Sequence, residues 1–293
     1  MSLGFSPGTE PGPGVHFRWL ETLWVQVTGT LCNIACRHCF IGCGPKATQI
    51  PVMARGTVEH AVEEGVAAGA RHVYFTGGEP FLHPDIRPLA MHALERAALT
   101  IITNGLLLDD GTVEWASRTF RTSRYSFDLR VSLDGVSAEE NDPVRGRGTY
   151  VRIVAALRRL GAAGLSPVVT VVEHAEGLEG AAARERFLDF VRSLGIAQPR
   201  VKFLPLLRIG REERRTHGYD EPLSPGPLPP AVETTLMCAS SRTVTSQGVY
   251  TCPILVEHSD ARLGSTLDQG LHDLRLRWRA CQTCILDGLR CTT

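Results

Sequence analysis

Short apolar runs alternate with longer amphipathic stretches over most of the chain, from about residue 24 to residue 207. The runs are apolar at consecutive positions rather than at every second one, which is typical of strands buried on both faces of a parallel sheet. Six strands are expected, at residues 24–28, 72–76, 100–103, 128–133, 168–172 and 201–206. Five helices are expected between them, at residues 55–68, 86–97, 112–121, 150–163 and 182–193.

This alternation of strand and helix predicts βαβ units and therefore an α/β fold. Gly69, Gly164 and Gly195 follow three of the helices, where left-handed C-terminal caps are common. Six β/α units are too few to close an eight-stranded barrel, so we predict an open, partial (β/α)6 TIM-type barrel over residues 16–220. In such folds the chemistry lies where the carboxyl ends of the strands and the following loops meet.

The two ends of the chain have a different composition. Residues 1–15 are rich in Gly, Pro and Ser and are predicted to be disordered. Residues 221–230 contain five prolines and read as a semi-rigid linker. In the segment 231–293, residues 243–245 and 249–251 predict a hairpin that turns at Gly248. This segment has too few apolar residues for a core of its own, so we expect a small separate domain stabilised by metal.

Charge and hydropathy exclude some partners. The chain has 31 basic and 31 acidic residues and no run of like charge, which argues against a nucleic-acid or membrane surface. Its apolar runs are far shorter than the roughly 20 residues that a membrane span needs, and residues 1–14 lack the pattern of a signal peptide. A cytoplasmic location is therefore predicted. Nine cysteines at short spacings then favour metal ligation over disulfides.

Three of these cysteines, Cys32, Cys36 and Cys39, form a Cys-x3-Cys-x2-Cys loop directly after the first strand. Three thiolates on a 4Fe–4S cubane leave one iron with an open position for a chelating ligand. A structural zinc loop or three unrelated core cysteines are the alternatives. Cys43 would fill the open position if it were a ligand, so we expect an ordinary loop thiol, with a substrate-side role as the less favoured reading. His38 is expected to face solvent or to donate to a sulfur.

The cysteine loop and the segment Thr76-Gly77-Gly78-Glu79-Pro80, at the end of the second strand, resemble the radical S-adenosylmethionine (SAM) superfamily and its GGEP motif. The resemblance implies a 4Fe–4S cluster whose open iron binds the amino and carboxylate groups of SAM. It also implies reductive cleavage of SAM to a 5′-deoxyadenosyl radical that abstracts a substrate hydrogen. An external one-electron donor of the flavodoxin or ferredoxin type would supply the electron.

The resemblance further implies a SAM site formed at the strand ends by Gly77, Gly78, Glu79, Pro80, Asn104, Ser132, Asp134, Arg145 and Leu204. In this reading Glu79 and the glycine backbone contact the amino group, and Leu204 lies against the adenine. Ser132 is favoured for the ribose and Arg145 for the methionine carboxylate. Asn104 could equally be a turn residue, Asp134 a cap, and Arg145 a solvated loop charge.

Five cysteines gather near the C-terminus, as a Cys-x13-Cys pair followed by Cys-x2-Cys-x6-Cys: Cys238, Cys252, Cys281, Cys284 and Cys291. They resemble the SPASM extension of radical SAM enzymes and its shorter "twitch" form. We predict one auxiliary 4Fe–4S cluster on Cys238, Cys252, Cys281 and Cys284, with Cys291 as a spare or substitute ligand. A zinc site would use the same thiolates. A fully ligated cluster would accept the electron left after hydrogen abstraction, which suits a net oxidation.

The function predicted from these features is that of a radical SAM oxidoreductase. Its reaction is expected to be oxidation or rearrangement of a small molecule in a biosynthetic pathway. Maturation of a ribosomally made peptide is the alternative, less favoured because the ~20 residues before the first strand cannot form a leader-peptide-binding domain. A zinc-stabilised binding module without enzymatic activity is the alternative from another class. No catalytic acid or base is identified.

Overall fold

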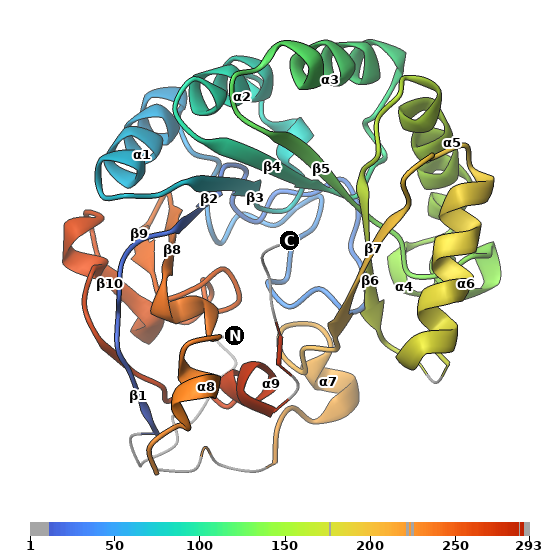
Figure 1. Ribbon diagram of the computed structural model, residues 1–293. Helices are drawn as coiled ribbons and strands as arrows, with labels where there is room; N and C mark the ends of the chain where they lie inside the picture. Colours follow the sequence, from blue (N-terminus) through green and yellow to red (C-terminus); the bar gives the residue numbers. More distant parts are fainter. Residues whose placement is uncertain (1–11, 176, 221–222, 224–225, 287, 290–293) are drawn as a thin grey trace.

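The computed structural model describes residues 12–175, 177–220, 223, 226–286 and 288–289 of the chain. Its centre is a curved sheet with helices along the outer face (Figure 1). Six strands lie parallel and side by side in chain order: β2 (Thr22–Gln26), β3 (His72–Thr76), β4 (Ala98–Thr103), β5 (Phe127–Ser132), β6 (Val168–Glu173) and β7 (Arg200–Pro205). All six predicted strands are confirmed, with bounds shifted by at most two residues.

The five predicted helices are also present, and the structure adds one more before the fourth. The helices between the strands are α1 (Arg55–Ala67), α2 (Ile86–Leu94), α3 (Asp110–Thr122), α4 (Ala138–Arg145), α5 (Thr149–Ala162) and α6 (Gly180–Ser193). Gly69, Gly164 and Gly195 have φ angles of 108°, 77° and 84°, so the predicted left-handed caps are confirmed. Helix α4 was not predicted from the sequence, and it places Arg145 at the end of a helix rather than in a loop.

The burial pattern of the strands shows why polar side chains lie on the inner face of the sheet. In β5 the apolar Leu129 and Val131 are buried in the core under the helices, whereas Arg130 and Ser132 line a cavity on the other face. Strand β5 therefore alternates between apolar and polar positions, contrary to the continuous apolar pattern expected for every strand. On the inner face, Trp24 of β2 stacks on Tyr74 of β3, with 4.3 Å between ring centroids.

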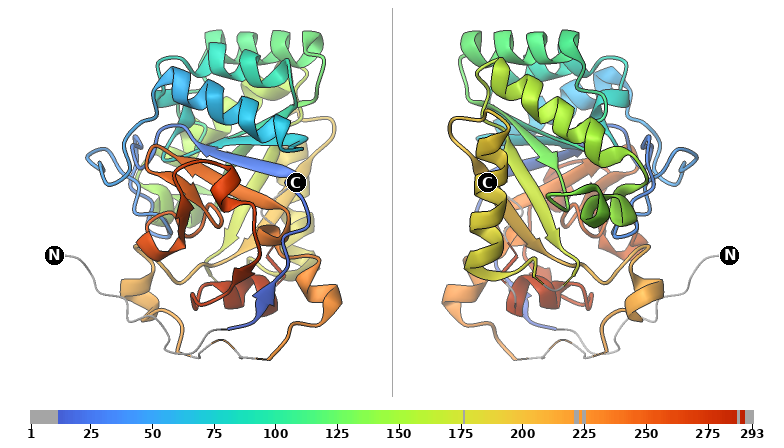
Figure 2. Two further views of the ribbon diagram at one scale, coloured as in Figure 1. Left: turned by 90° about the vertical axis from the view of Figure 1, so that its left-hand side faces the viewer. Right: turned by 90° about the vertical axis from the view of Figure 1, so that its right-hand side faces the viewer.

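The C-terminal segment joins the same sheet. Strand β8 (Ser241–Thr245) runs parallel to β2, and β9 (Gly248–Tyr250) and β10 (Arg262–Gly264) follow it antiparallel. The predicted hairpin is confirmed, but it extends the curved sheet to nine strands instead of folding apart from it. Figure 2 shows this segment packed along the β2 side of the sheet.

Both ends of the barrel segment differ from expectation where the structure describes them. Gly14–Val15 form strand β1, which pairs with β11 (Leu274–Arg275), so the predicted disorder does not extend to residue 15. Residues 1–11 lie outside the described residues, as do 221–222 and 224–225 of the predicted linker. The linker ends in a helix, α8 (Pro230–Glu233), because proline is well tolerated in a first helical turn.

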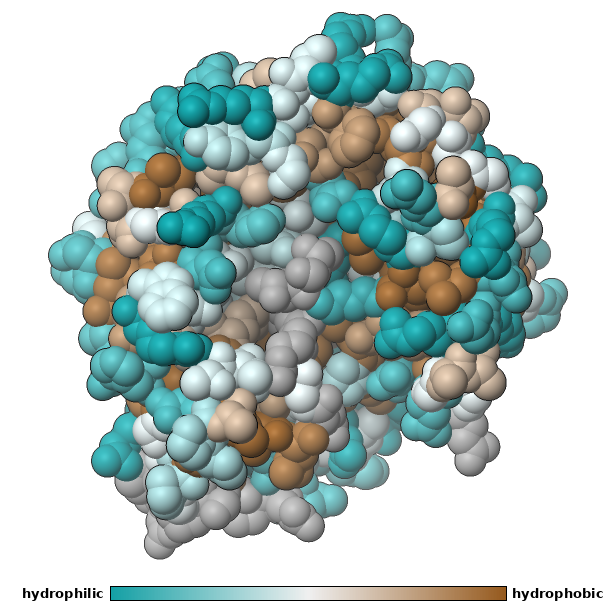
Figure 3. Space-filling view, in the orientation of Figure 1, coloured by the Kyte–Doolittle hydropathy of each residue, from teal (hydrophilic) through white to brown (hydrophobic). Residues whose placement is uncertain are grey.

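The remaining elements are short: η1 (Pro80–Leu82), α7 (Glu213–Thr216), η2 (Met237–Ala239), η3 (Ser259–Ala261), η4 (Asp268–Gly270) and α9 (Cys281–Leu286). Hydrophilic side chains predominate around the rim of the molecule (Figure 3). Within the described residues, no helix has the length and apolar character of a membrane span.

Candidate functional site

A cavity of about 210 Å³ lies inside the curved sheet, where the strand ends meet the cysteine loop. Four cysteines of the loop line it: Cys32, Cys36, Cys39 and Cys43. Six of the other predicted site residues also line it: Gly77, Gly78, Asn104, Ser132, Arg145 and Leu204. The tertiary structure therefore brings together residues from six separate segments of the chain. Glu79, Pro80 and Asp134 are not among the described residues that line the cavity.

Burial makes the loop thiols costly to ionise on their own. It raises the pKa of Cys32 to about 12 and that of Cys36 to about 11, and neighbouring thiolates add to the shift. A cationic metal centre would remove this cost, so the donor set fits a cluster. Among the described side chains, no three from His, Cys, Asp and Glu are arranged as for a single metal ion.

Cys43 lies against Cys39. A hydrogen bond between the two thiols lowers the pKa of Cys39 to about 6 despite its burial, and raises the pKa of Cys43 well above the usual range. Cys43 is therefore the donor and Cys39 the acceptor. The Cys43 sulfur also lies 3.7 Å from the Ile41 carbonyl, which competes with Cys39 for its single hydrogen. Its place in the cavity wall is compatible with both readings given to it from the sequence.

The glycines of the GGEP motif allow a close approach of two segments. The Gly78 N–H donates to the Gly29 carbonyl at 2.9 Å, and a Cβ at position 78 would lie 2.0 Å from the Leu31 oxygen. Gly77 has a φ of 131°, which disfavours any other residue. The motif thus packs directly under the cysteine loop and exposes backbone to the cavity.

Glu79 has a different place from the one expected. Its carboxylate is fully buried and accepts hydrogen bonds from the Thr103 hydroxyl at 2.7 Å, the Asn104 N–H at 2.7 Å and the Phe81 N–H at 3.1 Å. Burial raises the pKa of Glu79 to about 7, and these hydrogen bonds oppose the shift. Glu79 therefore ties the end of β3 to the end of β4, with no face of its carboxylate in the cavity wall. Pro80, buried, starts η1 beside it.

Asn104 has the turn contact proposed for it and a second contact with the cysteine loop. Its side-chain oxygen accepts from the Leu106 N–H at 3.0 Å, which forms a turn. Its amide nitrogen donates to Asn33 at 2.7 Å and lies 3.6 Å from the Cys32 sulfur. Asn104 therefore orients the cysteine loop from the end of β4.

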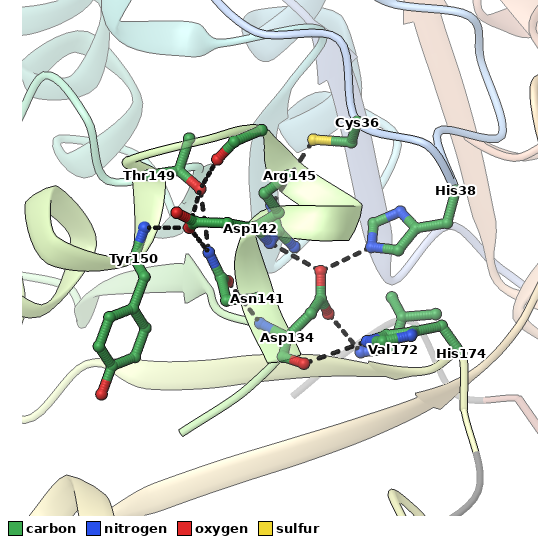
Figure 4. A network of polar contacts seen from close by, with 11 residues as sticks. Cys36, His38, Asp134, Asn141, Asp142, Arg145, Thr149, Tyr150, Val172 and His174 are labelled. Carbon is green, nitrogen blue, oxygen red and sulfur yellow. Dashed lines mark hydrogen bonds and ion pairs between the residues drawn. The ribbon is translucent and has the colours of Figure 1, made fainter. Parts of the chain in front are cut away.

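Asp134 is the centre of a buried polar network (Figure 4). One carboxylate oxygen accepts from His38 Nε2 at 2.6 Å and pairs with Arg145 Nε at 2.7 Å; the other accepts from the Val172 N–H at 2.8 Å. The backbone carbonyl of Asp134 accepts from His174 Nε2 at 3.1 Å. Burial alone would raise the pKa of Asp134, but the charge of Arg145 and the contact with His38 hold it well below its usual range.

This network corrects three expectations. His38 is 9% exposed and bonded to a carboxylate, so it neither faces solvent nor donates to a sulfur. Asp134 is 0% exposed and lies behind the cavity wall. Arg145 is no solvated loop charge: it is 6% exposed, it ends helix α4, and its Nη1 lies 4.0 Å from the Cys36 sulfur.

Arg211, which follows β7, was missed by the sequence reasoning. Its guanidinium donates to the carbonyls of Cys36 at 3.1 Å, Gly42 at 2.8 Å and Cys43. Its own N–H donates to the Cys39 carbonyl at 3.1 Å. Arg211 therefore binds the backbone of the cysteine loop at four points. The surrounding sequence gives no signal, because four arginines within eight residues read as a solvated surface.

The C-terminal cysteines come together beside the cavity but are not among the described residues that line it. Cys238 begins this group in η2, Cys252 follows β9, and Cys281 and Cys284 lie in α9. Burial raises the pKa of Cys281 well above its ordinary value, and the neighbouring Cys252 and Cys238 raise it further. All four pack within two adjoining apolar clusters. Cys291 lies outside the described residues.

A buried cation lies beside this group. Arg242 of β8 is 0% exposed and donates to the carbonyls of Gly270 and Cys238 at 2.6 Å, Ser241 at 2.7 Å and His272 at 2.8 Å. Burial lowers the pKa of Arg242 to about 10, while Cys238 and Cys252 oppose the shift. No carboxylate of the described chain forms an ion pair with it.

Comparison with known proteins identifies the class. The model of the radical SAM superfamily matches residues 27–175, about half of the chain, and the chain belongs to that superfamily. Members of this family bind a 4Fe–4S cluster and SAM, and the homologues found here are enzymes.

The individual relatives match only part of this chain, at about 30% sequence identity or less in most cases. Mycofactocin maturase MftC of Mycobacterium tuberculosis is 33% identical over 138 residues, which cover 47% of this chain and 34% of MftC. GTP 3′,8-cyclase of Moorella thermoacetica is 28% identical over 204 residues, which cover 66% of this chain and 58% of that protein. The chain thus spans about a third of MftC. Streptococcus suis SuiB bound to the precursor peptide SuiA shares the fold, with a TM-score of 0.64, 16% identity and coverage of 86% and 65% of the two chains.

Proposed function

We propose that this chain is a radical SAM enzyme in which Cys32, Cys36 and Cys39 hold the 4Fe–4S cluster and the adjoining cavity binds SAM and a peptide substrate. The observation that carries the proposal is the shared cavity: the three thiols of one short loop open onto the space bounded by the GGEP backbone and the ends of the strands. When bound, the cluster supplies the electron that cleaves SAM, and SAM supplies the 5′-deoxyadenosyl radical that removes a substrate hydrogen.

The side chains of the wall have separate tasks in this proposal. The bare backbone at Gly77 and Gly78 accepts the SAM amino group, since no side chain blocks it. The Ser132 hydroxyl, at the end of β5, hydrogen-bonds a polar group of SAM, and the Arg145 guanidinium binds the carboxylate. Leu204 belongs to the apolar part of the wall, which favours the adenine and excludes water.

A peptide substrate is now preferred over the small molecule expected from the sequence. The relatives include mycofactocin maturase, the subtilosin biosynthesis protein AlbA of Bacillus subtilis and a PqqA peptide cyclase, and SuiB was solved with its precursor peptide. GTP 3′,8-cyclase is the relative that keeps a small molecule as the second candidate. A donor of the flavodoxin or ferredoxin type and a cytoplasmic location remain predictions.

We further propose that residues 16–220 form the partial barrel and that residues 231–293 form an auxiliary region of the SPASM or twitch type. Cys238, Cys252, Cys281 and Cys284 would hold one 4Fe–4S cluster there. The buried Arg242 supports a metal–thiolate centre over four free thiols, because its charge has no carboxylate partner among the described residues. A zinc site would satisfy the same argument and is the alternative. Pro253 and Ile254, next to Cys252, line the cavity, so the proposed cluster would lie close to the substrate.

The test is anaerobic reconstitution with iron and sulfide, reduction, addition of SAM and measurement of 5′-deoxyadenosine. The variant Cys32→Ala/Cys36→Ala/Cys39→Ala is expected to make none, and to bind about four irons where the wild type binds about eight, for two cubane clusters. Cys43→Ala is the matched control, because it removes a buried thiol from the same loop and is expected to keep the cleavage. A wild-type protein that binds only zinc and yields no 5′-deoxyadenosine would contradict the proposal.

A further inference from the structure

Asp134 occupies a position that its expected contact with SAM does not explain. It follows β5, at the end of the strand that points at the cavity, yet its side chain is 0% exposed and turned into the protein (Figure 4). A buried carboxylate is costly unless hydrogen bonds and charges satisfy it. Here two hydrogen bonds do so, from His38 of the cysteine loop and from the Val172 N–H of β6, together with the ion pair to Arg145 of α4. The carboxylate therefore connects three segments that meet at the proposed cluster.

Two of the side chains that contact Asp134, His38 and Arg145, connect it to different parts of the cysteine loop. His38 is one of the two residues between Cys36 and Cys39, so the bond from its Nε2 fixes this part of the cysteine loop. Arg145 Nε forms an ion pair with Asp134 at 2.7 Å, and Nη1 of the same guanidinium lies 4.0 Å from the Cys36 sulfur. A guanidinium can make both contacts because it is a planar fork with donors on two edges.

The surrounding elements hold the carboxylate itself in place. The Val172 N–H, in β6, donates to the oxygen that His38 and Arg145 do not use. The Asn141 side chain accepts from the backbone N–H of Asp134 at 3.1 Å. With both ends of the residue fixed, Asp134 has one orientation, and so do the two side chains that bind it.

We propose that Asp134 is a positioning residue that aims Arg145 at the Cys36 side of the cluster and at the carboxylate of bound SAM, and that holds the cysteine loop through His38. This inference rests on the proposed function of the loop and cavity. It replaces the direct contact between Asp134 and SAM that the sequence suggested. In it Asp134 never touches SAM: it acts through Arg145 and His38.

The variant Asp134→Asn removes the charge and keeps the shape. Its amide cannot accept from His38, Arg145 and Val172 at once, so Arg145 loses its fixed direction. We expect the reconstituted variant to retain its iron and to bind SAM 10–100-fold more weakly, the usual cost when a group that orients a ligand is lost. The readout is the change that SAM causes in the electron paramagnetic resonance spectrum of the reduced cluster, titrated against SAM concentration. We also expect a more positive reduction potential, because a negative charge near the cluster is gone.

Glu140→Gln is the matched control. Glu140 lies in the same helix as Arg145, accepts from the Val136 N–H at 2.9 Å and pairs with Arg186 at 2.7 Å, with no bond to the cysteine loop. This variant loses a partly buried carboxylate and an ion pair but should bind SAM as the wild type does. Weakening of equal size in both variants would show a general loss of structure and overturn the inference.

A second variant covers the case in which Asp134→Asn does not fold. Arg145→Lys keeps the positive charge but has a single ammonium, which cannot contact Asp134 and the Cys36 side together. It is expected to weaken SAM binding by a similar factor, and unchanged affinity would overturn the inference. A wild-type protein whose spectrum does not respond to SAM would instead refute the proposed function of the cavity, so the two failures are distinguishable.

Discussion

The two cysteine groups of this chain lie in opposite environments. Cys32, Cys36 and Cys39 line a cavity, and Arg145, a buried cation beside Cys36, is paired with Asp134. The C-terminal cysteines pack inside apolar clusters, and the buried Arg242 beside them donates to carbonyls and lies over the Phe17 ring, with no carboxylate partner among the described residues. An open site with balanced charge suits a cluster that must admit a ligand. A closed site with an unbalanced cation suits an anionic centre that needs no ligand from outside.

Removal of C-terminal cysteines, the closed group, should have the largest effect on bound iron after removal of the loop cysteines, the open group. We expect Cys281→Ser/Cys284→Ser to bind about four irons fewer, of about eight, because one cubane is lost. Cleavage of SAM should persist, since the loop and cavity are intact, whereas complete turnover of substrate should fail. Iron analysis and 5′-deoxyadenosine measurement check this. Loss of SAM cleavage as well would show that the two groups do not act separately.

Arg211 should matter to the open group only. Arg211→Gln removes the donors to the carbonyls of Cys36, Gly42 and Cys43. We expect the loop to hold its cluster 10–100-fold more weakly, the range found when an orienting group is lost. The rate of iron release to a chelator, followed by loss of visible absorbance, measures this. Arg208→Gln, in the same segment, is the control, and an equal effect there would contradict the role given to Arg211.

Arg242 should matter to the closed group only. In a background of Cys32→Ala/Cys36→Ala/Cys39→Ala, the remaining cluster can be studied alone. Arg242→Gln removes a buried positive charge and should lower the reduction potential of that cluster, while Arg242→Lys should restore most of it. Both variants lose hydrogen bonds to buried carbonyls and should lose about 2–4 kcal/mol of stability. Equal potentials in Gln and Lys variants would show that the charge is not what the site uses.

The smallest expected effect concerns Glu79 and the pH. Its pKa in the folded protein is about 7, against an ordinary value of 4.5. Since the folded state binds this proton more tightly, its contribution to stability is complete below pH 4.5 and is lost as the pH rises to about 7. The loss is on the order of 3 kcal/mol. Glu79→Gln should flatten this part of the pH profile of urea unfolding for the metal-free protein. An unchanged slope would contradict the assignment.

Local patterns in the sequence were sufficient for the strands and most helices. The run at residues 72–76 became β3 without change, because its central residues Val73, Tyr74 and Phe75 are all buried in the sheet. Helix α4 escaped prediction since it contains Pro143 and is followed by Gly146 and Gly148. Its N-terminus is stabilised by Ser137, which accepts from the Glu140 N–H, but its apolar content is too low to show a helical period.

Long-range pairing was beyond local patterns. The hairpin at residues 243–251 could be predicted because Gly248 favours a turn. The local sequence does not predict that β8 pairs in parallel with β2 (Figure 1). That pairing joins positions more than 200 residues apart, such as Thr22 and Ser241. A two-part molecule was therefore expected where the structure has one continuous sheet.

The sequence by itself determined the alternation of strands and helices, the two cysteine groups and the GGEP motif, because each depends on spacing within a short segment. Only the tertiary structure decided which polar side chains face the cavity. Asp134 and Glu79 both end in carboxylates at strand ends, and both turned inward, because donors from distant segments satisfy them there. His38 and Asp134 are 96 residues apart in the chain, and the bond between them exists only once the loop has folded onto the sheet.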